Sequence, residues 1–305
     1  MSMDIKNVMI LGGRGNLGPY LIRAFLKAGF NVSVLSRASS NVGDDNFLGA
    51  AVIKSDYSFD SLVKVFAGQD AVVSTLATAN IDEQKIVVDA VAAAKVKRFV
   101  PSEFGSDTSV DDLDTVAPFL KEKQNFMNYV KSKESEGLSW TAMITGSFID
   151  WMLLEANGLL CLDLKTKTGE LVDSGDAIFT TTTAHQVGEA AAAALLHSEK
   201  TKNEYVYVSS FNTTQKELIE AIERLSGDKF KLGAVSQKDL YQRAMKHVDE
   251  GNWARGYYEL ATATMYANLP VSYFPDQAAR WMKELGLVQD ETFDEVIARV
   301  LKVVT

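Results

Sequence analysis

Residues 8–18, VMILGGRGNLG, form the stretch of this chain that decides its fold. Four consecutive apolar residues predict a buried strand, and they run directly into a glycine-rich turn. An apolar stripe at helical spacing follows the turn and ends before Gly29: Leu21, Ile22, Phe25 and Leu26. The order of strand, tight turn and helix is typical of the start of a nucleotide-binding α/β fold.

The glycines have the spacing G-x-x-G-x-x-G, with Gly12, Gly15 and Gly18 at the fixed positions. Gly12 would allow the turn, Gly15 would let a pyrophosphate approach the backbone, and Gly18 would let the helix pack close to the sheet. The free N–H groups of the helix N-terminus would then offer an anion site. Three glycines in a loop are more often simple turn residues, but the position between a strand and a helix favours a dinucleotide cradle.

Strands and helices alternate regularly beyond this motif. Apolar runs predict further strands over 31–36, 50–54, 71–76, 96–100 and 138–145, and helical periodicity predicts helices over 59–67, 81–94 and 118–136. Such a βα series predicts an α/β fold with a doubly wound parallel sheet of the Rossmann type.

The alternation breaks after Gly146 without a Pro- or Gly-rich linker. Residues 168–182 suggest a hairpin, 187–196 an Ala-rich helix and 204–210 a strand, while Thr214 and Ser236 are expected helix N-caps. Residues 237–301 are mostly helical by period, with a break at 268–270. We expect residues 1–150 to form an NADP-binding Rossmann domain, with 151–305 as the main substrate-binding part, a smaller mixed α+β region interleaved with the sheet.

Composition restricts the partners. The 305 residues are 47% hydrophobic and 23% charged, with a formal charge of −9 and no dense Lys/Arg cluster, so neither nucleic acid nor a membrane surface is an expected partner. The single Cys161 and three scattered His residues have no metal-ligand spacing, so no metal is expected. No run approaches the ~18 apolar residues of a membrane span, and we expect a cytoplasmic protein.

The residue after the second predicted strand indicates the cofactor. An NAD-specific fold usually has Asp or Glu there, whereas this chain has Ser36 and Arg37. Arg37 suits a 2′-phosphate, and Arg14 in the glycine turn adds a second positive charge. NADP (NADPH) is therefore expected over NAD, and the alternative is a solvated surface arginine.

Two lysine patterns compete for a catalytic role. The string from Tyr129 to Lys133 matches Tyr-x-x-x-Lys, but Lys133 is only five residues before the sixth strand, at the helix end far from the cofactor edge. Lys123 instead falls in the first turns of that helix, on its apolar stripe with Phe119 and Phe126. It could act as acid or base with a lowered pKa, hold the nicotinamide ribose, or simply extend from the edge of the core.

The substrate is expected beside residues 147–154, where the chain leaves the sixth strand. Phe148, Trp151 and Met152 form an apolar run just outside the sheet edge, which is poorly explained as surface. Packing against the C-terminal helices is the other interpretation. Aromatic residues of those helices, such as Tyr257 and Tyr258, are more often core than binding site, although some should line a pocket.

These residues resemble the NmrA-like, isoflavone-reductase-like branch of the atypical short-chain dehydrogenases. The resemblance is carried by GGRGNLG at 12–18, Arg37, RFVPSEFG at 98–105, the Lys-x-x-Phe-x-x-Tyr-Val pattern from Lys123 and TGSFIDW at 145–151. It implies that Lys123 is the catalytic lysine. It also implies that NADP is held by the glycine turn, Arg37 and the end of the fourth strand: Gly12, Arg14, Gly15, Asn16, Leu17, Gly18, Ser74, Thr75 and Leu76. The chain departs from plant-type reductases at Met127 and Asn128, where those enzymes usually have arginines.

Three functions remain in competition. The leading hypothesis is an NADPH-dependent reductase acting on a carbonyl, enone or benzylic centre of a small aromatic or polyketide-like molecule, with a homodimer left open. The first alternative is a nucleotide-sensing regulator without turnover, which is expected to lack the lysine that this chain has at Lys123. An isomerase or cyclase on the same fold is the second alternative.

Overall fold

A five-stranded parallel sheet forms the centre of the computed structural model, which describes residues 4–40, 47–77, 81–154 and 159–304. Its order is β3-β2-β1-β4-β5, with strands β1 (Asn7–Leu11), β2 (Asn31–Arg37), β3 (Ala51–Ser55), β4 (Ala71–Ser74) and β5 (Arg98–Val100). A parallel bridge from Phe99 to Trp140 continues the sheet to the parallel pair β6 (Thr141–Ile144) and β11 (Glu204–Tyr207). The predicted parallel, doubly wound sheet is therefore confirmed.

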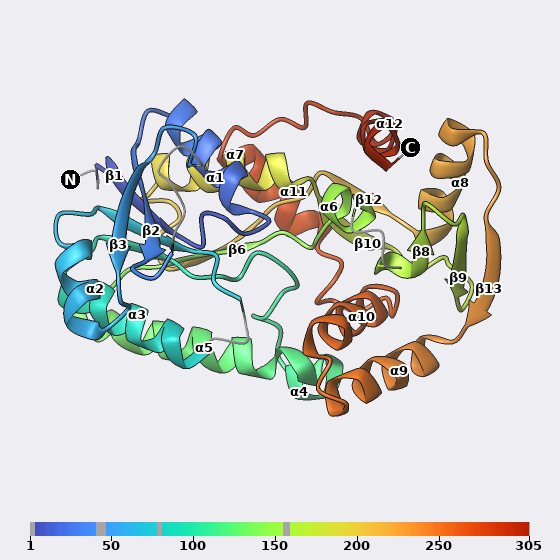
Figure 1. Ribbon diagram of the computed structural model, residues 1–305, viewed down its shortest axis with the longest axis horizontal. Helices are drawn as coiled ribbons and strands as arrows, with labels where there is room; N and C mark the ends of the chain where they lie inside the picture. The colour runs from blue at the N-terminus through green and yellow to red at the C-terminus, as the bar shows by residue number, and fades with distance from the viewer. Residues whose placement is uncertain (1–3, 41–46, 78–80, 155–158, 305) are drawn as a thin grey trace.

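Helices cover both faces of this sheet (Figure 1). One face carries α1 (Gly18–Lys27), α7 (Ala184–Leu196) and α11 (Pro275–Glu284), and the other carries α2 (Phe59–Phe66), α3 (Ile81–Ala93) and α5 (Lys121–Ser132). Successive side chains of β1 alternate between the two cores, since Val8 and Ile10 pack on one side and Met9 and Leu11 on the other. This is why the strand reads as an unbroken apolar run.

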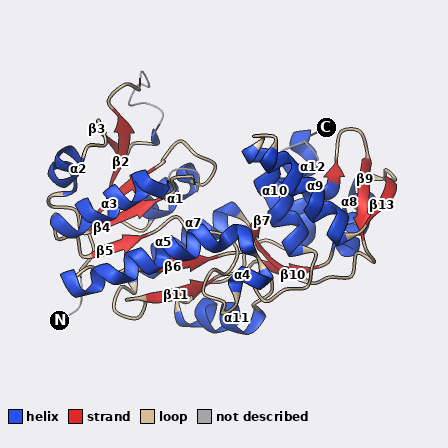
Figure 2. Cartoon of the chain, turned by 90° about the horizontal axis from the view of Figure 1, so that it is seen from below, coloured by secondary structure: helices blue, strands red, loops and turns tan. Residues whose placement is uncertain are grey.

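A second group of elements has its own core and lies beside the carboxyl edge of the sheet (Figures 1 and 2). Its helices are α6 (Ile149–Leu154), α8 (Gln215–Ser226), α9 (Gln237–Asp249), α10 (Trp253–Met265) and α12 (Phe293–Val304). Two small sheets accompany them: β7 (Ser147–Phe148), β10 (Phe179–Thr182) and β12 (Phe211–Thr213), and β8 (Leu162–Asp163), β9 (Thr168–Val172) and β13 (Lys231–Val235). The short α4 (Leu113–Val116) precedes α5.

The predicted helix starts of this region are confirmed. Thr214 and Glu217 form a reciprocal capping box on α8, and the Ser236 hydroxyl accepts from the backbone N–H of Asp239 at the start of α9. The break at 268–270 separates α10 from α11, as expected.

The predicted hairpin over 168–182 is wrong. Its two strands do not pair with each other: β9 pairs with β8 and β13, whereas β10 pairs with β7 and β12. The sequence does not predict β13 because four of its five residues are exposed, so it has no alternating pattern. A partner from elsewhere in the chain thus replaces the local one.

Three elements that follow residue 150, namely α7, β11 and α11, lie with the large sheet rather than with the second group. The division into a cofactor part and a substrate part near residue 150 stays a prediction, with these elements crossing the boundary. No described helix combines the length and apolar composition that crossing a bilayer requires.

Candidate cofactor and active site

The glycine turn lies at the carboxyl end of β1, between β2 and β4, where the strand order reverses. Gly12 has a φ of +81°, and a Cβ there would lie 2.5 Å from the Thr75 hydroxyl oxygen. A Cβ on Gly18 would lie 2.3 Å from the carbonyl oxygen of Gly13. Both positions therefore require glycine, because the turn and the first turn of α1 approach other backbone too closely for any side chain.

The outer part of the turn is accessible. Arg14, Gly15 and Asn16 are exposed, whereas the Leu17 side chain is buried in the core beneath α1. Within the described residues, the backbone N–H groups of Asn16 and Leu17 donate to no acceptor, although both lie immediately before α1. A turn with free N–H groups at a helix start is suited to bind a pyrophosphate, so the residues fit a dinucleotide.

The end of β4 is hydrogen-bonded to the glycine turn. Thr75 donates its hydroxyl hydrogen to the carbonyl oxygens of Leu11 at 2.8 Å and Gly12 at 3.1 Å. Ser74 is fully buried, and Leu76 is half-buried on the core that includes α5. The structure thus brings Ser74 and Thr75 to the turn, with Thr75 joining the end of β4 to the glycine backbone, whereas Leu76 packs on the neighbouring core.

Arg37 ends β2 on the same edge and already has two partners. Its guanidinium donates to both carboxylate oxygens of Glu83 on α3, at 2.6 and 2.8 Å, and lies 4.7 Å from the ring centre of Tyr57. Half of the Arg37 side chain is exposed, so it can also reach a ligand from solvent. The nearby carboxylate of Glu83 was not anticipated from the sequence.

Lys123 lies on the buried stripe of α5 with Phe126, Met127 and Val130, as the spacing predicted. Its residue is only 8% exposed, and its ammonium donates to the backbone oxygen of Glu103 at 3.0 Å. Lys121, two residues earlier, is instead half-buried and bound to Asp114 and Gln124. The two neighbouring lysines therefore have different environments.

A cavity of about 160 Å³ opens beside Lys123. The segments that line it follow β5 and β6, lie at the start of α5, or belong to α6, β10, α10 and the loop before α11, and most of their side chains are apolar or aromatic. The lining residues are Phe104, Gly105, Ser106, Leu120, Lys123, Gly146, Ser147, Phe148, Trp151, Met152, Thr180, Tyr257, Tyr258, Ala261, Met265 and Ser272. An apolar cavity with one amine in its wall suits an aromatic ligand that carries an oxygen.

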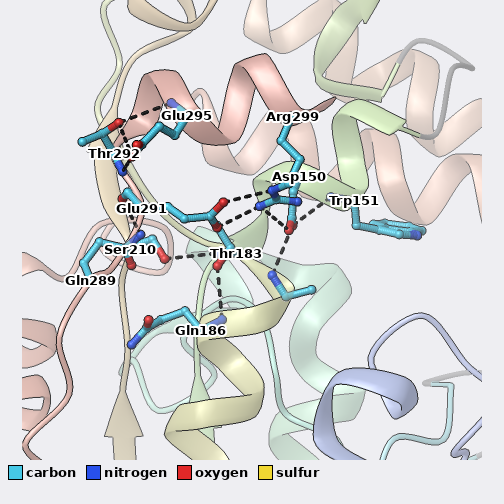
Figure 3. A network of polar contacts seen from close by, with 11 residues as sticks. Asp150, Trp151, Thr183, Gln186, Ser210, Gln289, Glu291, Thr292, Glu295 and Arg299 are labelled. Atoms are coloured by element: carbon cyan, nitrogen blue, oxygen red, sulfur yellow. Dashed lines mark hydrogen bonds and ion pairs between the residues drawn. The ribbon is translucent and has the colours of Figure 1, made fainter. Parts of the chain in front are cut away.

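The structure brings the three predicted substrate residues to this cavity: Phe148, Trp151 and Met152. Trp151 also packs on Tyr258 of α10, with ring centroids 5.4 Å apart, so lining the cavity and packing against C-terminal helices are both realised. The neighbouring Asp150 holds α6 in place, since one carboxylate oxygen accepts from the backbone N–H groups of Trp151 and Ala184 (Figure 3).

The string from Tyr129 to Lys133 lies away from the cavity. The Tyr129 hydroxyl donates to Asp89 on α3 at 2.6 Å, and the Lys133 ammonium is 2.7 Å from the same carboxylate. Burial and the bond to Asp89 raise the pKa of Tyr129, so this phenol is held protonated. The pair connects α5 to α3, as expected for the far end of the helix.

Sequence reasoning missed the carboxyl group next to Lys123. Glu103 is 1% exposed in the loop that leaves β5, and burial raises its pKa above the usual range. The signal was available, because the string PSEFG at 101–105 follows a buried strand at the carboxyl edge. Tyr257 and Tyr258, considered more often core, also line the cavity.

No group of His, Cys, Asp and Glu among the described residues is arranged to hold a metal ion. Cys161 is buried, and burial raises its pKa to about 12, so it is an unreactive thiol.

The fold and this site define an α/β protein with a glycine turn at the carboxyl edge of its parallel sheet and an apolar cavity that contains Lys123. The model of the NmrA-like family matches residues 4–265, and the chain belongs to that family. Its membership agrees with the resemblance expected from the glycine turn and the PSEFG string.

Similar proteins extend this assignment over the full chain. Oxidoreductase aprR of Aspergillus flavus is 29% identical over 98% of this chain and 100% of its own length, and Oxidoreductase poxI of Penicillium oxalicum is 28% identical over 94% and 91%. A solved complex of leucoanthocyanidin reductase with NADPH from Vitis vinifera superposes with a TM-score of 0.79 at 20% identity, covering 97% of this chain and 99% of that chain. The names of the two relatives agree with the expected oxidoreductase class, and the structural neighbour shows the shared fold.

Proposed function

We propose that this protein is an NADPH-dependent reductase of a small aromatic or polyketide-like molecule, acting at a carbonyl, enone or benzylic centre. One observation carries the proposal: the Lys123 amine forms part of the wall of a cavity that is otherwise mostly apolar and aromatic, at the edge where the glycine turn lies. The relatives named oxidoreductases and the NADPH complex of a structural neighbour support it.

The residues of the cofactor edge each have a definite task in this proposal. The backbone of 12–18 would hold the pyrophosphate, and the Thr75 hydroxyl stabilises that backbone through its hydrogen bonds to Leu11 and Gly12. Arg37 would pair with the 2′-phosphate. A nicotinamide bound in this way would supply a hydride to the substrate carbon.

Lys123 would supply the proton. Its Nζ is fixed by the backbone oxygen of Glu103 at 3.0 Å, so one of its N–H bonds is committed and the others are left to face a ligand. As the hydride reaches the substrate carbon, negative charge develops on the substrate oxygen, and an ammonium at hydrogen-bond distance would protonate it.

The size of the cavity limits what can bind. A cavity of about 150 Å³ holds benzene, so about 160 Å³ accommodates one aromatic ring. Trp151, Tyr257 and Tyr258 would contact that ring and exclude water from the reacting atoms.

The test is NADPH oxidation with aromatic ketones, enones and quinone-like substrates, comparing wild type with Lys123→Ala. We expect turnover to fall by about a hundredfold or more, the usual scale for loss of a general acid, with NADPH affinity changed much less. Lys121→Ala is the matched control, because Lys121 lies in the same helical turn but binds Asp114 and Gln124, and it should keep wild-type turnover.

The outcomes separate the competing functions. A weakened NADPH affinity with near-normal turnover at saturation would make Lys123 a ribose ligand instead. Tight NADPH binding without oxidation of NADPH by any substrate would contradict the reductase, and the sensor or isomerase would then take its place.

A further inference from the structure

Glu103 is a buried carboxyl group that the proposed reaction does not use. It is 1% exposed and lies in the loop between β5 and α4. Its Oε2 accepts a hydrogen bond from the hydroxyl of Thr108, whereas its Oε1 is buried and has no hydrogen-bond partner among the described residues. Burying a carboxylate oxygen without a hydrogen-bond partner costs free energy of folding.

The unpartnered oxygen faces the proposed catalytic amine. Lys123 Nζ is 3.8 Å from Glu103 Oε1 and 3.0 Å from the Glu103 backbone oxygen. The backbone contact fixes where the amine lies. The carboxylate is too far for a hydrogen bond in this arrangement, but it is close enough to act through its charge.

We propose that Glu103 is a positioning residue for Lys123, whose buried carboxylate keeps the lysine amine in its ammonium form while the Glu103 backbone oxygen aims it into the cavity. The proposal rests on the proposed function, because it assigns a protonation state to the amine that reaction would use. It goes further by choosing between two roles: an ammonium can protonate an oxyanion, but it cannot take a proton from a phenol.

The physical reason is a balance of two opposing effects on Lys123. Burial disfavours the ammonium, and an opposite charge within ~4–6 Å favours it. Without the carboxylate, the first effect would act alone and the amine would lose its proton at lower pH. The Glu103 carboxylate thus favours the charged form of Lys123 that the proposed protonation step needs.

The charges around the pair come from several elements. Burial raises the pKa of Glu103 most strongly, the Lys123 ammonium and the Thr108 hydroxyl oppose that, Asp107 adds to it, and Lys131 opposes it. The pKa of Tyr205 on β11, which faces the same carboxyl, is raised by burial, so that phenol stays neutral. On the cavity side, the phenols of α10 are the titratable neighbours of Lys123: Tyr257 and Tyr258.

The charge of Glu103 should make the protonation of Lys123 depend on pH. Above the raised pKa of Glu103 the carboxylate is charged and holds the proton on Lys123, and below that pKa this support is lost. At alkaline pH the reaction should fail when Lys123 finally deprotonates. Removing the charge of Glu103 should move this alkaline limit to lower pH.

The experiment measures the titration of Lys123 directly and does not require turnover. Lysines are reductively methylated with ¹³C-formaldehyde, and the signal that disappears in Lys123→Arg is assigned to Lys123. In Glu103→Gln, we expect this signal to titrate roughly one to three pH units lower than in wild type, and the alkaline limb of kcat/KM to move by the same amount.

Asp107→Asn is the matched control. Asp107 is buried at 4% exposure in the same loop, but its carboxylate is bound to Ser109 and Tyr207 and makes no ion pair with Lys123. In Asp107→Asn, the titration of Lys123 should move much less than in Glu103→Gln. Equal shifts in both variants would overturn the specific role of Glu103.

An unchanged Lys123 titration in a Glu103→Gln protein with a wild-type melting temperature would also overturn it. If that variant does not fold, the titration of wild type still tests the proposal. The Lys123 signal of wild type should then show a second inflection at acidic pH, where Glu103 titrates. Absence of that inflection would contradict the proposal. Failure of the proposed function is distinguishable: the protein would then oxidise no NADPH, while the Lys123 titration would still respond to Glu103.

Discussion

A single neighbouring carboxylate changes how Arg37 can bind a ligand. The sequence suggested a free arginine ready for a 2′-phosphate, whereas the structure pairs it with Glu83 and stacks it on Tyr57. A 2′-phosphate would have to displace a carboxylate that carries the same sign of charge. The pair is partly exposed, so the competition it offers is worth at most about 1 kcal/mol.

Cofactor preference is therefore expected to depend on both partners. Wild type should bind NADPH more tightly than NADH by roughly tenfold to a hundredfold, and Arg37→Ala should remove most of that difference. Glu83→Gln should tighten NADPH binding by up to about fivefold, because the phosphate no longer replaces a carboxylate. Fluorescence titration with NADPH and with NADH measures the dissociation constants of wild type and of each variant.

Asp82→Asn is the control for that experiment, because Asp82 lies one residue earlier on α3 and its side chain is 99% exposed. It should leave both affinities unchanged. Equal affinity of wild type for NADPH and NADH would contradict the assignment of Arg37.

At the scale of the element, the direction of α5 decides which of its residues reach the cavity. The helix begins at Lys121, beside the loops that follow β5, and runs away from the carboxyl edge, so Lys123 lies at the cavity and Tyr129 at α3. Tyr129 and Lys133, which match the Tyr-x-x-x-Lys pattern in sequence, therefore lie away from the cavity.

Tyr129→Phe should consequently leave kcat within about twofold of wild type while lowering stability by about 0.5–1.5 kcal/mol, the contribution of one hydrogen bond. The bond concerned is the one from its hydroxyl to Asp89. Steady-state kinetics and urea unfolding measure the two effects. Loss of turnover in a folded variant that still binds NADPH would show that this placement of α5 is wrong.

The helix α6 carries the apolar wall of the cavity. Trp151→Ala should raise KM by roughly twofold to tenfold with little change in kcat, because it removes an aromatic contact worth about 0.5–1.5 kcal/mol to a bound ring. Trp253→Ala provides the comparison, since Trp253 is 66% exposed at the start of α10 and does not line the cavity. An unchanged KM in Trp151→Ala would remove α6 from the substrate site.

At the scale of the whole molecule, one buried carboxylate joins three helices. Asp150 on α6 accepts from the backbone N–H of Ala184, the first residue of α7, at 3.1 Å and lies 3.7 Å from the Arg299 guanidinium of α12 (Figure 3). Arg299 is itself bound bidentately by Glu291. The cavity helix is thus tied both to the sheet layer and to the C-terminal helix.

Asp150→Ala should destabilise the protein by about 1–3 kcal/mol, because it leaves the buried N–H of Ala184 without an acceptor. Arg224→Ala, which breaks an exposed pair with Asp294 on the same α12, should cost less than about 1 kcal/mol. Thermal unfolding of the two variants tests the difference. Equal melting temperatures would show that Asp150 is not a structural link.

The pattern of apolar residues was sufficient for the parallel sheet, the glycine turn and the buried face of α5. Each depends on neighbours in the chain: unbroken apolar runs, glycine spacing, and the helical period that puts Lys123 beside Phe126. Patterns among neighbouring residues were therefore enough to predict the glycine turn and the helix that carries Lys123.

Tertiary structure decided what these residues meet. The pairing of β9 with β13, the Glu83 carboxylate at Arg37 and the Glu103 carboxylate at Lys123 all join segments whose separation in sequence carries no periodic signal. Charge acts over distances in space, and a buried carboxylate affects only the groups that folding places within a few ångströms of it. The sequence by itself thus determined the parallel sheet and the position of the lysine on α5, whereas only the folded chain paired β9 with β13 and brought Glu103 to Lys123.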